Sequence, residues 1–447
     1  MEKPHKFNGY ILAAGHGTRM RSSLAKPLHQ VGGIAMLGWV IETAQKAGAD
    51  QLCVVTSTKN DQVADYVKKT YPALITARQE QALGTGHATR TAHQAIPQND
   101  KPILVLFGDT PLVTAETCQR MIARIVQGED VVVLGFEPDN PTGYGRLKCD
   151  EDGMITAIIE DADASEDDKA IALVNAGVMA LSAKAASHYL SAISNDNAQK
   201  EYYLTDIVAI ARADHNKVGY VTASEDEVRG VNSRNDLAEV EALLQNRLRR
   251  NVMASGVTLQ APETVFLSGD AIIEEDVTIE PHVVIGKGCV IKTGAILKAF
   301  SHIEGAILGK HTVIGPYARL RPGTELGDHV KIGNFVEIKK SQFEDGAKAN
   351  HLSYIGDAFV GEKSNIGAGT ITCNYDGYDK FKTTIGKGAF IGSNTALVAP
   401  VTIGEGAIIG AGSTITKSVT DNDLSLTRAP QKTLPKGGTS FRARKGK

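Results

Sequence analysis

The chain has 447 residues, of which 42% are hydrophobic and 22% are charged, a composition typical of a soluble globular protein with two or more domains. Its formal net charge of −3 predicts no bulk affinity for nucleic acid or for an anionic membrane surface. The sequence has no apolar run of about eighteen residues and no export signal at its start, so we expect no membrane insertion. The five cysteines are scattered without metal-ligand spacing, which predicts reduced thiols and a cytoplasmic location.

Residues 1–230 alternate short aliphatic runs with helical patterns. The pattern predicts strands at Tyr10–Ala13, Leu52–Thr56, Ile103–Phe107 and Val131–Phe136, and helices at Ile34–Ala47 and Thr114–Val126. This order predicts an α/β, Rossmann-like domain in which helices cover a mostly parallel sheet.

A polar stretch, Ser233–Ala254, follows this domain. Four aliphatic residues from Leu237 to Leu248 recur in it at helical spacing. We therefore predict a linker helix within residues 231–255, with Ser233 as its N-cap.

Residues 256–447 are dominated by a six-residue repeat. From Ile385 the sequence reads IGKGAF, IGSNTA, LVAPVT, IGEGAI and IGAGST, and a tract from Leu308 repeats in the same phase. A period of six in an extended chain turns every aliphatic residue the same way, and such units bury their apolar side only by coiling and stacking. We predict a parallel β-helix of hexapeptide repeats over about residues 257–419. The basic tail after it, KGGTSFRARKGK, is expected to be disordered or to lie over another surface.

The first chemical motif is LAAGHGTRM, Leu12–Met20, directly after the first predicted strand. Gly15 and Gly17 permit a tight turn whose backbone N–H groups form an anion-binding nest. Arg19 and Lys26 add positive charge, although the loop alone is equally compatible with an ordinary strand–helix turn. This loop, followed by Lys-Pro, resembles the nucleoside triphosphate signature of the sugar-nucleotidyltransferase family.

Two further segments support this interpretation. LGTGHA, Leu83–Ala88, has glycines that let the backbone approach a nucleobase. FGDTPL, Phe107–Leu112, puts Asp109 at the carboxyl end of a predicted strand, where a carboxylate can hold Mg²⁺ between phosphates. A turn or capping residue is the alternative for Asp109.

The whole chain, over nearly all of residues 8–430, resembles the GlmU family of bifunctional enzymes. The resemblance rests on the motifs TGYGR (Thr142–Arg146), VNAG (Val174–Gly177), EYYLTDI (Glu201–Ile207), GVNSR (Gly230–Arg234), RLRPG (Arg319–Gly323), NFVEIKK (Asn334–Lys340), HLSYIGD (His351–Asp357) and NIGAGTITCNYDG (Asn365–Gly377). It implies acetyl transfer from acetyl-CoA to glucosamine-1-phosphate, then uridylyl transfer from UTP to N-acetylglucosamine-1-phosphate with release of pyrophosphate. The product, UDP-N-acetylglucosamine, would supply cell-wall and lipopolysaccharide synthesis.

The resemblance also implies residue roles in the uridylyltransferase site. The uridine nucleotide would be held by Leu12, Ala13, Ala14, Gly15, Gln79, Gly84 and Thr85. The sugar would be held by Gly145, Glu160 and Asn175, Mg²⁺ by Asp109 and Asn232, and the triphosphate by Arg19 and Lys26. The sequence departs from the family in two places, with His16 in place of Lys and Phe107 in place of Tyr, so we assign no side-chain role to either position.

A second site is expected where the repeat breaks. The six-residue phase is lost after Ile338 and again between Thr370 and Ile385, where a polar segment reads as a loop leaving the coil. His351 follows the first break, and the resemblance implies that it is the general base of acetyl transfer. Histidine suits proton transfer at neutral pH, although most histidines are surface or packing residues.

The remaining implied residues belong to the same acetyltransferase site. The sugar phosphate would be bound by Arg321, Lys339, Tyr354 and Asn365, and acetyl-CoA by Ala368, Asn374, Tyr375, Ser393, Ala411 and Arg428. The family coil is left-handed and its β-helices pack as a homotrimer.

Two other functions remain open from the residues. A nucleotidyltransferase with a purely architectural β-helix, such as an ADP-glucose or GDP-mannose synthase, would have no need for His351, Lys339 and the Asn374 loop together. A non-enzymatic regulatory subunit should lack Arg19, Lys26 or Asp109, and all three are present.

Overall fold

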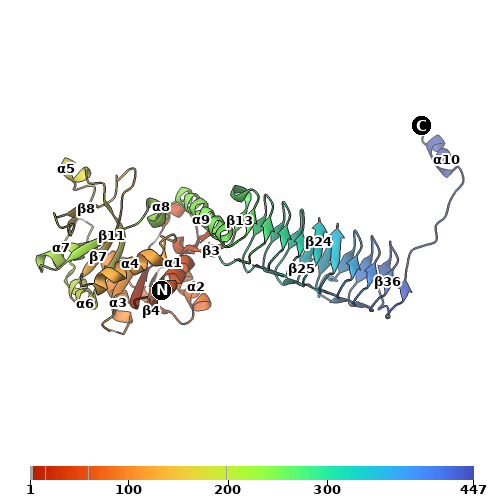
Figure 1. Ribbon diagram of the computed structural model, residues 1–447, viewed down its shortest axis with the longest axis horizontal. Helices are drawn as coiled ribbons and strands as arrows, with labels where there is room; N and C mark the ends of the chain where they lie inside the picture. Colours follow the sequence, from red (N-terminus) through yellow and green to blue (C-terminus); the bar gives the residue numbers. More distant parts are fainter. Residues whose placement is uncertain (1–3, 16, 59, 98, 198, 447) are drawn as a thin grey trace. The chain divides into compact units, whose positions relative to one another are not determined.

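The structure is a computed structural model that describes residues 4–446, with gaps at 16, 59, 98 and 198. It divides into two compact units, residues 1–245 and 246–447 (Figure 1). Within the described ranges no helix is both long and apolar enough to cross a membrane. His16, one of the two departures from the family pattern, lies outside the described residues.

The first unit is built on a mixed sheet whose main path runs β11-β7-β10-β6-β1-β4-β5. These strands are β1 (Phe7–Leu12), β4 (Ala49–Ser57), β5 (Ile75–Gln79), β6 (Ile103–Phe107), β7 (Val131–Phe136), β10 (Val174–Leu181) and β11 (Val218–Thr222). Only β10 runs antiparallel to its neighbours on this path. An antiparallel pair, β8 (Arg146–Cys149) and β9 (Ile155–Ile159), branches from β10, and β2 (Gln30–Val31) pairs separately with β3 (Ile34–Ala35).

Helices cover both faces of this sheet, which confirms the predicted α/β class. One face is covered by α1 (Met36–Lys46), α2 (Gln62–Thr70) and α4 (Ala115–Val126), and the other by α3 (Thr85–Ala95), α6 (Ala183–Ala192) and α7 (Asp206–Ala213). Short helices α5 (Glu166–Lys169) and α8 (Glu225–Val228) lie in the connections. Alternate strand residues serve the two layers, since Ile11 packs in one core cluster and Tyr10 and Leu12 in the other.

Element ends differ from the predicted ones by a few residues. The helix predicted from Ile34 begins at Met36, because Ile34 and Ala35 pair with the preceding strand β2. The predicted helix at Thr114 begins at Ala115, and the Thr114 side chain accepts a hydrogen bond from the Thr117 amide as its N-cap.

The predicted linker helix is α9, Arg234–Ala254. The Ser233 hydroxyl accepts from the Asp236 amide at 3.2 Å, and the Asp236 carboxylate accepts from the Ser233 amide at 2.9 Å. This reciprocal pair is a capping box and confirms Ser233 as the N-cap. The last turns of α9 belong to the second unit, where Leu248 and Val252 pack against the core of the β-helix.

The second unit is a β-helix of three parallel sheets, as the repeat predicts. The first sheet contains β12 (Thr258–Leu259), β15 (Thr278–Ile279), β18 (Ile296–Leu297), β21 (Val313–Ile314), β24 (Lys331–Asn334), β27 (Lys348–His351), β30 (Asn365–Ile366), β33 (Phe390–Ile391), β36 (Ile408–Ile409) and β38 (Leu424–Ser425). The second contains β13 (Phe266–Leu267), β16 (Val284–Ile285), β19 (His302–Ile303), β22 (Arg319–Leu320), β25 (Glu337–Lys339), β28 (Tyr354–Gly356), β31 (Ile371–Cys373), β34 (Ala396–Val398) and β37 (Thr414–Ile415). The third contains β14 (Ile272–Ile273), β17 (Val290–Ile291), β20 (Ala306–Leu308), β23 (Thr324–Leu326), β26 (Gln342–Phe343), β29 (Ala358–Val360), β32 (Thr383–Ile385) and β35 (Val401–Ile403).

The aliphatic residue of each repeat points into the coil. Ile279, Ile285, Ile291 and Leu297 are at most 1% exposed and belong to one continuous core cluster. Each coil covers the apolar edge of the next, so stacking supplies the burial that a single repeat lacks. The left-handed sense of the coil stays a prediction.

Both predicted breaks correspond to changes in the coil. The turn between β25 and β26 is one residue shorter than a full repeat and places Lys340 at a φ of 45°. Residues 374–382 leave the coil between β31 and β32 as a loop, inside which Tyr375 and Lys380 pair. In the tail, Gly437–Arg444 form the short helix α10 with exposed side chains, where the sequence predicts disorder or contact with another surface.

Aromatic rings line the corner between the first and second sheets. We call His282, Phe300, Tyr317 and Phe335 the aromatic ladder, because their rings stack on successive coils with centroids 4.9, 4.9 and 5.2 Å apart. All four residues have a φ between 55° and 60°, which turns each ring outward at the corner. Leu352 occupies the same corner on the next coil.

Two candidate active sites

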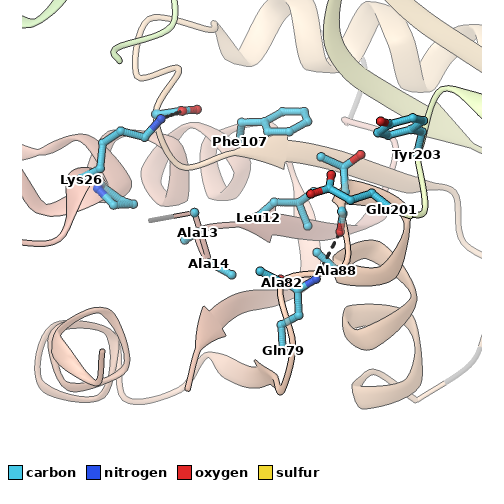
Figure 2. A pocket seen from close by; sticks show the side chains of 15 residues that line it. Leu12, Ala13, Ala14, Lys26, Gln79, Ala82, Ala88, Phe107, Glu201 and Tyr203 are labelled. Carbon is cyan, nitrogen blue, oxygen red and sulfur yellow. Dashed lines mark hydrogen bonds and ion pairs between the residues drawn. The ribbon is translucent and has the colours of Figure 1, made fainter. Parts of the chain in front are cut away.

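A cavity of about 330 Å³ lies at the carboxyl ends of β1, β5 and β6 (Figure 2). Strand β1 has β4 on one side and β6 on the other, so the cavity lies where the order of the strands reverses, the usual ligand position in such sheets. The lining residues are Leu12, Ala13, Ala14, Gly15, Lys26, Pro27, Gln79, Ala82, Gly84, Thr85, Ala88, Phe107, Asp109, Glu201 and Tyr203. Every residue expected to hold the uridine nucleotide is among them, together with Lys26 and Asp109.

The loop after β1 brings Lys26 to the cavity. Gly17 has a φ of 57°, and a Cβ built on it would lie 2.6 Å from the Cβ of Lys26. Only glycine therefore lets the loop pass so close to the short helix η2, Lys26–Leu28. The Lys26 ammonium makes an ion pair with Asp109 and donates to Asn232 Oδ1 at 3.1 Å.

The oxygens of Asp109 and Asn232 thus converge on one positive charge. Oxygen donors are what Mg²⁺ prefers, and Mg²⁺ usually takes only one or two protein ligands alongside water and phosphate. In the described part of the chain no three His, Cys, Asp or Glu side chains gather into a metal cluster. A two-oxygen site that is completed by a nucleotide fits this donor set.

Arg19 lies outside the cavity lining, on the exposed short helix η1, Thr18–Met20. Its charge acts on Asp236, which accepts hydrogen bonds from the backbone of Asn232 and Ser233. Burial acts to raise the pKa of Asp236, but these hydrogen bonds and Arg19 outweigh burial and lower it. The ionised Asp236 in turn holds the Asn232 backbone beside the cavity.

The turn at Gly84 is held by the EYYLTDI segment. Gly84 has a φ of 96°, and a Cβ there would lie 2.6 Å from the carbonyl oxygen of Tyr202. The Gly86 amide donates to that same oxygen at 2.8 Å, and the Leu204 amide donates to the Thr85 hydroxyl at 3.1 Å. The glycine is therefore required by close packing of two backbones, which places Thr85 at the cavity wall.

The three residues expected to hold the sugar are grouped on the β8–β9–β10 branch and do not line this cavity. The Asn175 amide donates to the Gly145 carbonyl oxygen at 2.8 Å, and the Glu160 carboxylate lies 3.6 Å from a Cβ built on Gly145. Burial, and then the charges of Asp163 and Asp206, raise the pKa of Glu160.

Sequence reasoning missed three notable lining residues, Phe107, Glu201 and Tyr203. Phe107 lacks the family hydroxyl and carries no predicted role, yet its ring forms part of the wall, and a Cβ built on Gly177 would meet it at 3.2 Å. Glu201 and Tyr203 lie within the quoted EYYLTDI motif, and that motif was the signal that could have found them.

In the β-helix, His351 ends β27 with an exposed ring whose Nδ1 lies 2.7 Å from Asn334 Oδ1. The parallel register pairs Asn334 directly with His351 on the next coil. An amide oxygen only accepts, so Nδ1 donates the hydrogen and Nε2 keeps its lone pair for a base. Asn334 is thus an orienting residue that the sequence did not predict, although the NFVEIKK motif contains it.

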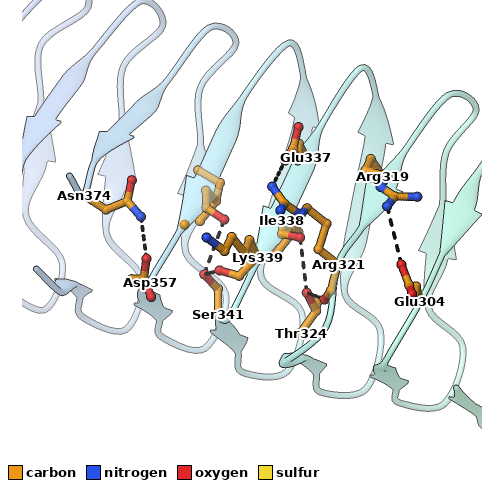
Figure 3. Close-up of polar contacts among 12 residues, drawn as sticks. Glu304, Arg319, Arg321, Thr324, Glu337, Ile338, Lys339, Ser341, Asp357 and Asn374 are labelled. Carbon is orange, nitrogen blue, oxygen red and sulfur yellow. Dashed lines mark hydrogen bonds and ion pairs between the residues drawn. The ribbon is translucent and has the colours of Figure 1, made fainter. Parts of the chain in front are cut away.

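Three of the residues expected to bind the sugar phosphate lie on neighbouring coils of the second sheet. Arg321 follows β22, Lys339 ends β25 and Tyr354 begins β28. The Arg321 guanidinium donates to Glu337 at 2.8 Å, as Figure 3 shows, whereas Lys339 makes no ion pair with any residue in the described ranges. Asn365 is not brought to this face, since it lies in the first sheet beside Lys348.

The loop residue Asn374 returns to the same second-sheet face. Its Nδ2 donates to the Asp357 carboxylate, as drawn in Figure 3. A Cβ built on Gly356 would lie 2.5 Å from the Tyr354 hydroxyl and 2.9 Å from Asn374 Nδ2. Gly356 therefore leaves the space that both side chains approach. Tyr375 is exposed, and its hydroxyl donates to the Gly377 carbonyl oxygen within the loop.

The other residues expected to contact acetyl-CoA follow the corner of the β-helix between its first and second sheets. This corner continues the aromatic ladder, but from Ala368 onward it carries small residues. The Asn394 amide donates to the Ala368 carbonyl oxygen at 2.7 Å, and the Gly412 amide to that of Ser393 at 2.8 Å. At the end of the row, the Arg428 guanidinium donates to the Ala411 carbonyl oxygen at 2.6 Å.

Comparisons with known proteins assign both units to families. Residues 9–255 match the model of the MobA-like NTP transferase domain, and residues 305–340 and 382–417 match the bacterial transferase hexapeptide (six repeats).

The similarity extends to full-length relatives. The bifunctional protein GlmU of Azorhizobium caulinodans is 51% identical over 437 residues, which cover 98% of this chain and 97% of the relative. That of Zymomonas mobilis is 48% identical over 446 residues, 99% of each chain, and that of a Bradyrhizobium species is 52% identical over 432 residues, 97% of this chain and 96% of the relative. The chain therefore belongs to the GlmU family of bifunctional uridylyltransferases and acetyltransferases, which make UDP-N-acetylglucosamine.

Proposed function

We propose that this chain carries out its two reactions at the two sites described above. Residues 1–230 would transfer the uridylyl group and residues 256–447 the acetyl group. The helix within residues 231–255 would link these two domains. The observation that carries the proposal is the convergence of Lys26, Asp109 and Asn232 beside a cavity lined by all the expected nucleotide residues.

In uridylyl transfer, a phosphate oxygen of N-acetylglucosamine-1-phosphate attacks the α-phosphorus of UTP, and pyrophosphate leaves with the electrons of the broken bond. Catalysis then rests on positioning and on neutralising charge. Lys26 would stabilise the triphosphate from inside the cavity, and Arg19 from the exposed helix η1. Gly145, Glu160 and Asn175 would hold the sugar on the neighbouring branch.

Asp109 and Asn232 would hold Mg²⁺, which when bound neutralises phosphate charge. Their oxygens now meet the Lys26 ammonium, so the positions of the donors suit a cation. With a metal present, Lys26 would be released toward the negatively charged phosphates.

In acetyl transfer, Nε2 of His351 would take a proton from the ammonium of glucosamine-1-phosphate. The freed nitrogen attacks the thioester carbonyl, the C–S bond breaks, and the thiolate takes up a proton equivalent to the one that the new amide nitrogen loses, so coenzyme A leaves as the thiol. The Asn334 hydrogen bond at 2.7 Å holds the ring for this step. Arg321, Lys339 and Tyr354 would bind the sugar phosphate from the second sheet and Asn365 from the first, and Lys339 has no ion-pair partner among the described residues.

The small residues at Ala368, Ser393 and Ala411 leave room along the corner for the extended thiol arm of acetyl-CoA. Asn374 and Tyr375 would contact the same donor from the loop, and Arg428 would face its phosphates.

A homotrimer is part of the proposal. Phe300, Tyr317 and Phe335 of the aromatic ladder are 48%, 46% and 55% exposed, and Leu352 continues them at 61%. A contiguous apolar corner of this kind is typical of an interface. We propose that it packs against a second copy of the chain, which would supply the other wall of the acetyltransferase site. A cytoplasmic location belongs to the same proposal, in accord with five free cysteines.

An assay with glucosamine-1-phosphate, acetyl-CoA, UTP and Mg²⁺ tests the whole proposal. Thiol release and pyrophosphate release are followed separately, and UTP is omitted in a second run. We expect both products, with thiol release persisting without UTP. Pyrophosphate release without thiol release would instead support a nucleotidyltransferase with an architectural β-helix, and neither product from folded protein would refute both activities.

A further inference from the structure

The side-chain amide of Gln79 is fixed in one orientation at the end of β5. Gln79 lines the cavity and is 6% exposed. Its Nε2 donates to the Gly84 carbonyl oxygen at 3.2 Å, the dashed line beside Gln79 in Figure 2, and lies 3.0 Å from Nδ1 of His87. A backbone carbonyl oxygen only accepts hydrogen bonds, so the atom that faces Gly84 has to be the amide nitrogen.

His87 completes this arrangement from the first turn of α3. Because Nε2 of Gln79 has only hydrogens to offer, Nδ1 of His87 accepts, and the imidazole carries its proton on the other nitrogen. Burial, and then the charge of Arg90, lower the pKa of His87, which favours the neutral ring. The nearby N-terminus of the helix also disfavours an imidazolium.

Both amide hydrogens of Gln79 are therefore used within the protein. In the described residues no donor reaches Gln79 Oε1, which is left as the polar atom of this side chain available to a ligand. A lone-pair acceptor at this position requires a ligand group with a hydrogen to donate. Uracil has such a donor at N3, whereas the N3 atom of cytosine carries a lone pair.

We propose that His87 is a positioning residue: by accepting a hydrogen bond from Gln79 Nε2, it holds Gln79, a residue already expected to bind the uridine nucleotide, with Oε1 toward the nucleobase. The proposal rests on the uridylyl transfer proposed above and names the atom that reads the base. His87 acts through Gln79 and does not itself contact the nucleotide.

The test compares UTP with 3-methyluridine triphosphate, in which a methyl group replaces the hydrogen on N3. Wild-type protein should discriminate strongly against the methylated nucleotide. His87→Ala should lower kcat/KM for UTP about tenfold, mainly through KM, because the amide regains rotational freedom, while kcat/KM for the methylated nucleotide stays unchanged. The ratio of kcat/KM for UTP to kcat/KM for the methylated nucleotide should therefore fall by the same factor. His87→Asn should restore most of the ratio, since Asn Oδ1 offers an acceptor near the place of Nδ1.

His93 provides the matched control on the same helix. Its Nδ1 lies 3.0 Å from the Tyr10 hydroxyl, and it does not line the cavity. The His93→Ala substitution should leave the ratio of kcat/KM values for the two nucleotides unchanged, even if it lowers the stability of the protein. Equal losses for both nucleotides in His87→Ala, or no recovery in His87→Asn, would show a merely structural role and overturn the proposal. Thermal unfolding and thiol release from the second unit report whether each variant is folded.

The two proposals fail in different ways. Wild-type protein that releases no pyrophosphate from UTP would refute uridylyl transfer. The base-reading role would then be measured by calorimetric binding of uridine and 3-methyluridine diphosphates to wild type and His87→Ala. Equal affinities of the wild type for the two would refute the role of Gln79 and His87.

Discussion

The two candidate sites differ in how far a single chain encloses them. The first is a cavity of about 330 Å³ at the edge of a sheet, with the side chains of Lys26 and Asp109 only 12% and 24% exposed. The second lies on the outer faces of a prism, where His351 is exposed and the side chain of Arg321 is 40% exposed.

The difference follows from the geometry of the two folds. Parallel strands of an open sheet end at one edge, so β1, β5 and β6 direct their following residues toward a common point. Outward side chains of a β-helix stand on flat faces and diverge at the corners, so His351 and Arg321 stand on an open wall of the β-helix. The first site is thus preorganised by the folding of one chain, whereas for the second we propose that a neighbouring copy supplies the opposite wall.

The largest effect is expected for His351→Ala. Loss of a positioned general base should lower acetyl transfer by about 10²–10⁴, measured as thiol release, and leave uridylyl transfer unchanged. His329→Ala is the matched control, because His329 is also exposed in the β-helix and stacks with His311 at 5.1 Å. Equal loss of both activities would indicate misfolding, and the variant would then give no support for two separate active sites.

Lys26→Ala should lower uridylyl transfer by about 10²–10³, as expected for a lost contact to developing phosphate charge. Thiol release should continue at the wild-type rate, since that reaction belongs to the other site. Lys46→Ala, on the surface of α1 with its side chain 70% exposed, removes an equal charge without touching the cavity. A near-normal pyrophosphate release in Lys26→Ala would exclude Lys26 from the site.

Phe335→Glu is expected to have a smaller effect, which should be confined to acetyl transfer at the site on the β-helix. A charge on the aromatic ladder should dissociate the proposed trimer, seen by light scattering, and lower thiol release about tenfold or more at a fixed concentration. Uridylyl transfer should persist, because its cavity is complete within one chain. Ile272→Glu, at an apolar position 59% exposed on the third sheet, is the control. A Phe335→Glu variant that stays trimeric would place the interface elsewhere.

The sequence predicted those features that depend on local pattern. The hexapeptide period predicted the β-helix and its inward-facing residues, such as Ile285 and Leu297, because periodicity records which side chains share a side of the chain. The glycine loops and the family motifs predicted nine of the fifteen residues that line the first cavity. The sequence pattern also predicted Ser233 as the N-cap of α9, which needs only adjacent residues.

Features that depend on pairing across the fold were not predicted. Asn334 orients His351 only because the register of two coils places them opposite each other. Glu201 and Tyr203 reach the cavity through packing of their segment on the Gly84 turn, about 120 residues earlier in the chain. The His87–Gln79 contact likewise joins a helix to a strand end, and the spacing of the two residues alone does not indicate it.

The smallest predicted effect is a change in the pKa of Glu362, which tests whether charged side chains on the surface of the β-helix are exposed to solvent. Glu362 accepts hydrogen bonds from Lys363 at 2.8 Å and Lys387 at 2.6 Å, and these two bonds lower its pKa from 4.5 to about 2. Because the folded pKa lies below the unfolded one, the stabilisation by this carboxylate is present above pH 4.5 and is lost as the pH falls toward 2. NMR titration of the side-chain carboxyl should show the low pKa in the wild type and a higher one in Lys387→Met. Since these side chains are largely solvated, 0.5 M salt should also move the pKa toward 4.5, whereas a buried pair would resist screening. A Glu362 that titrates near 4.5 in low salt would show that both lysines point into solvent and that the pairs do not form.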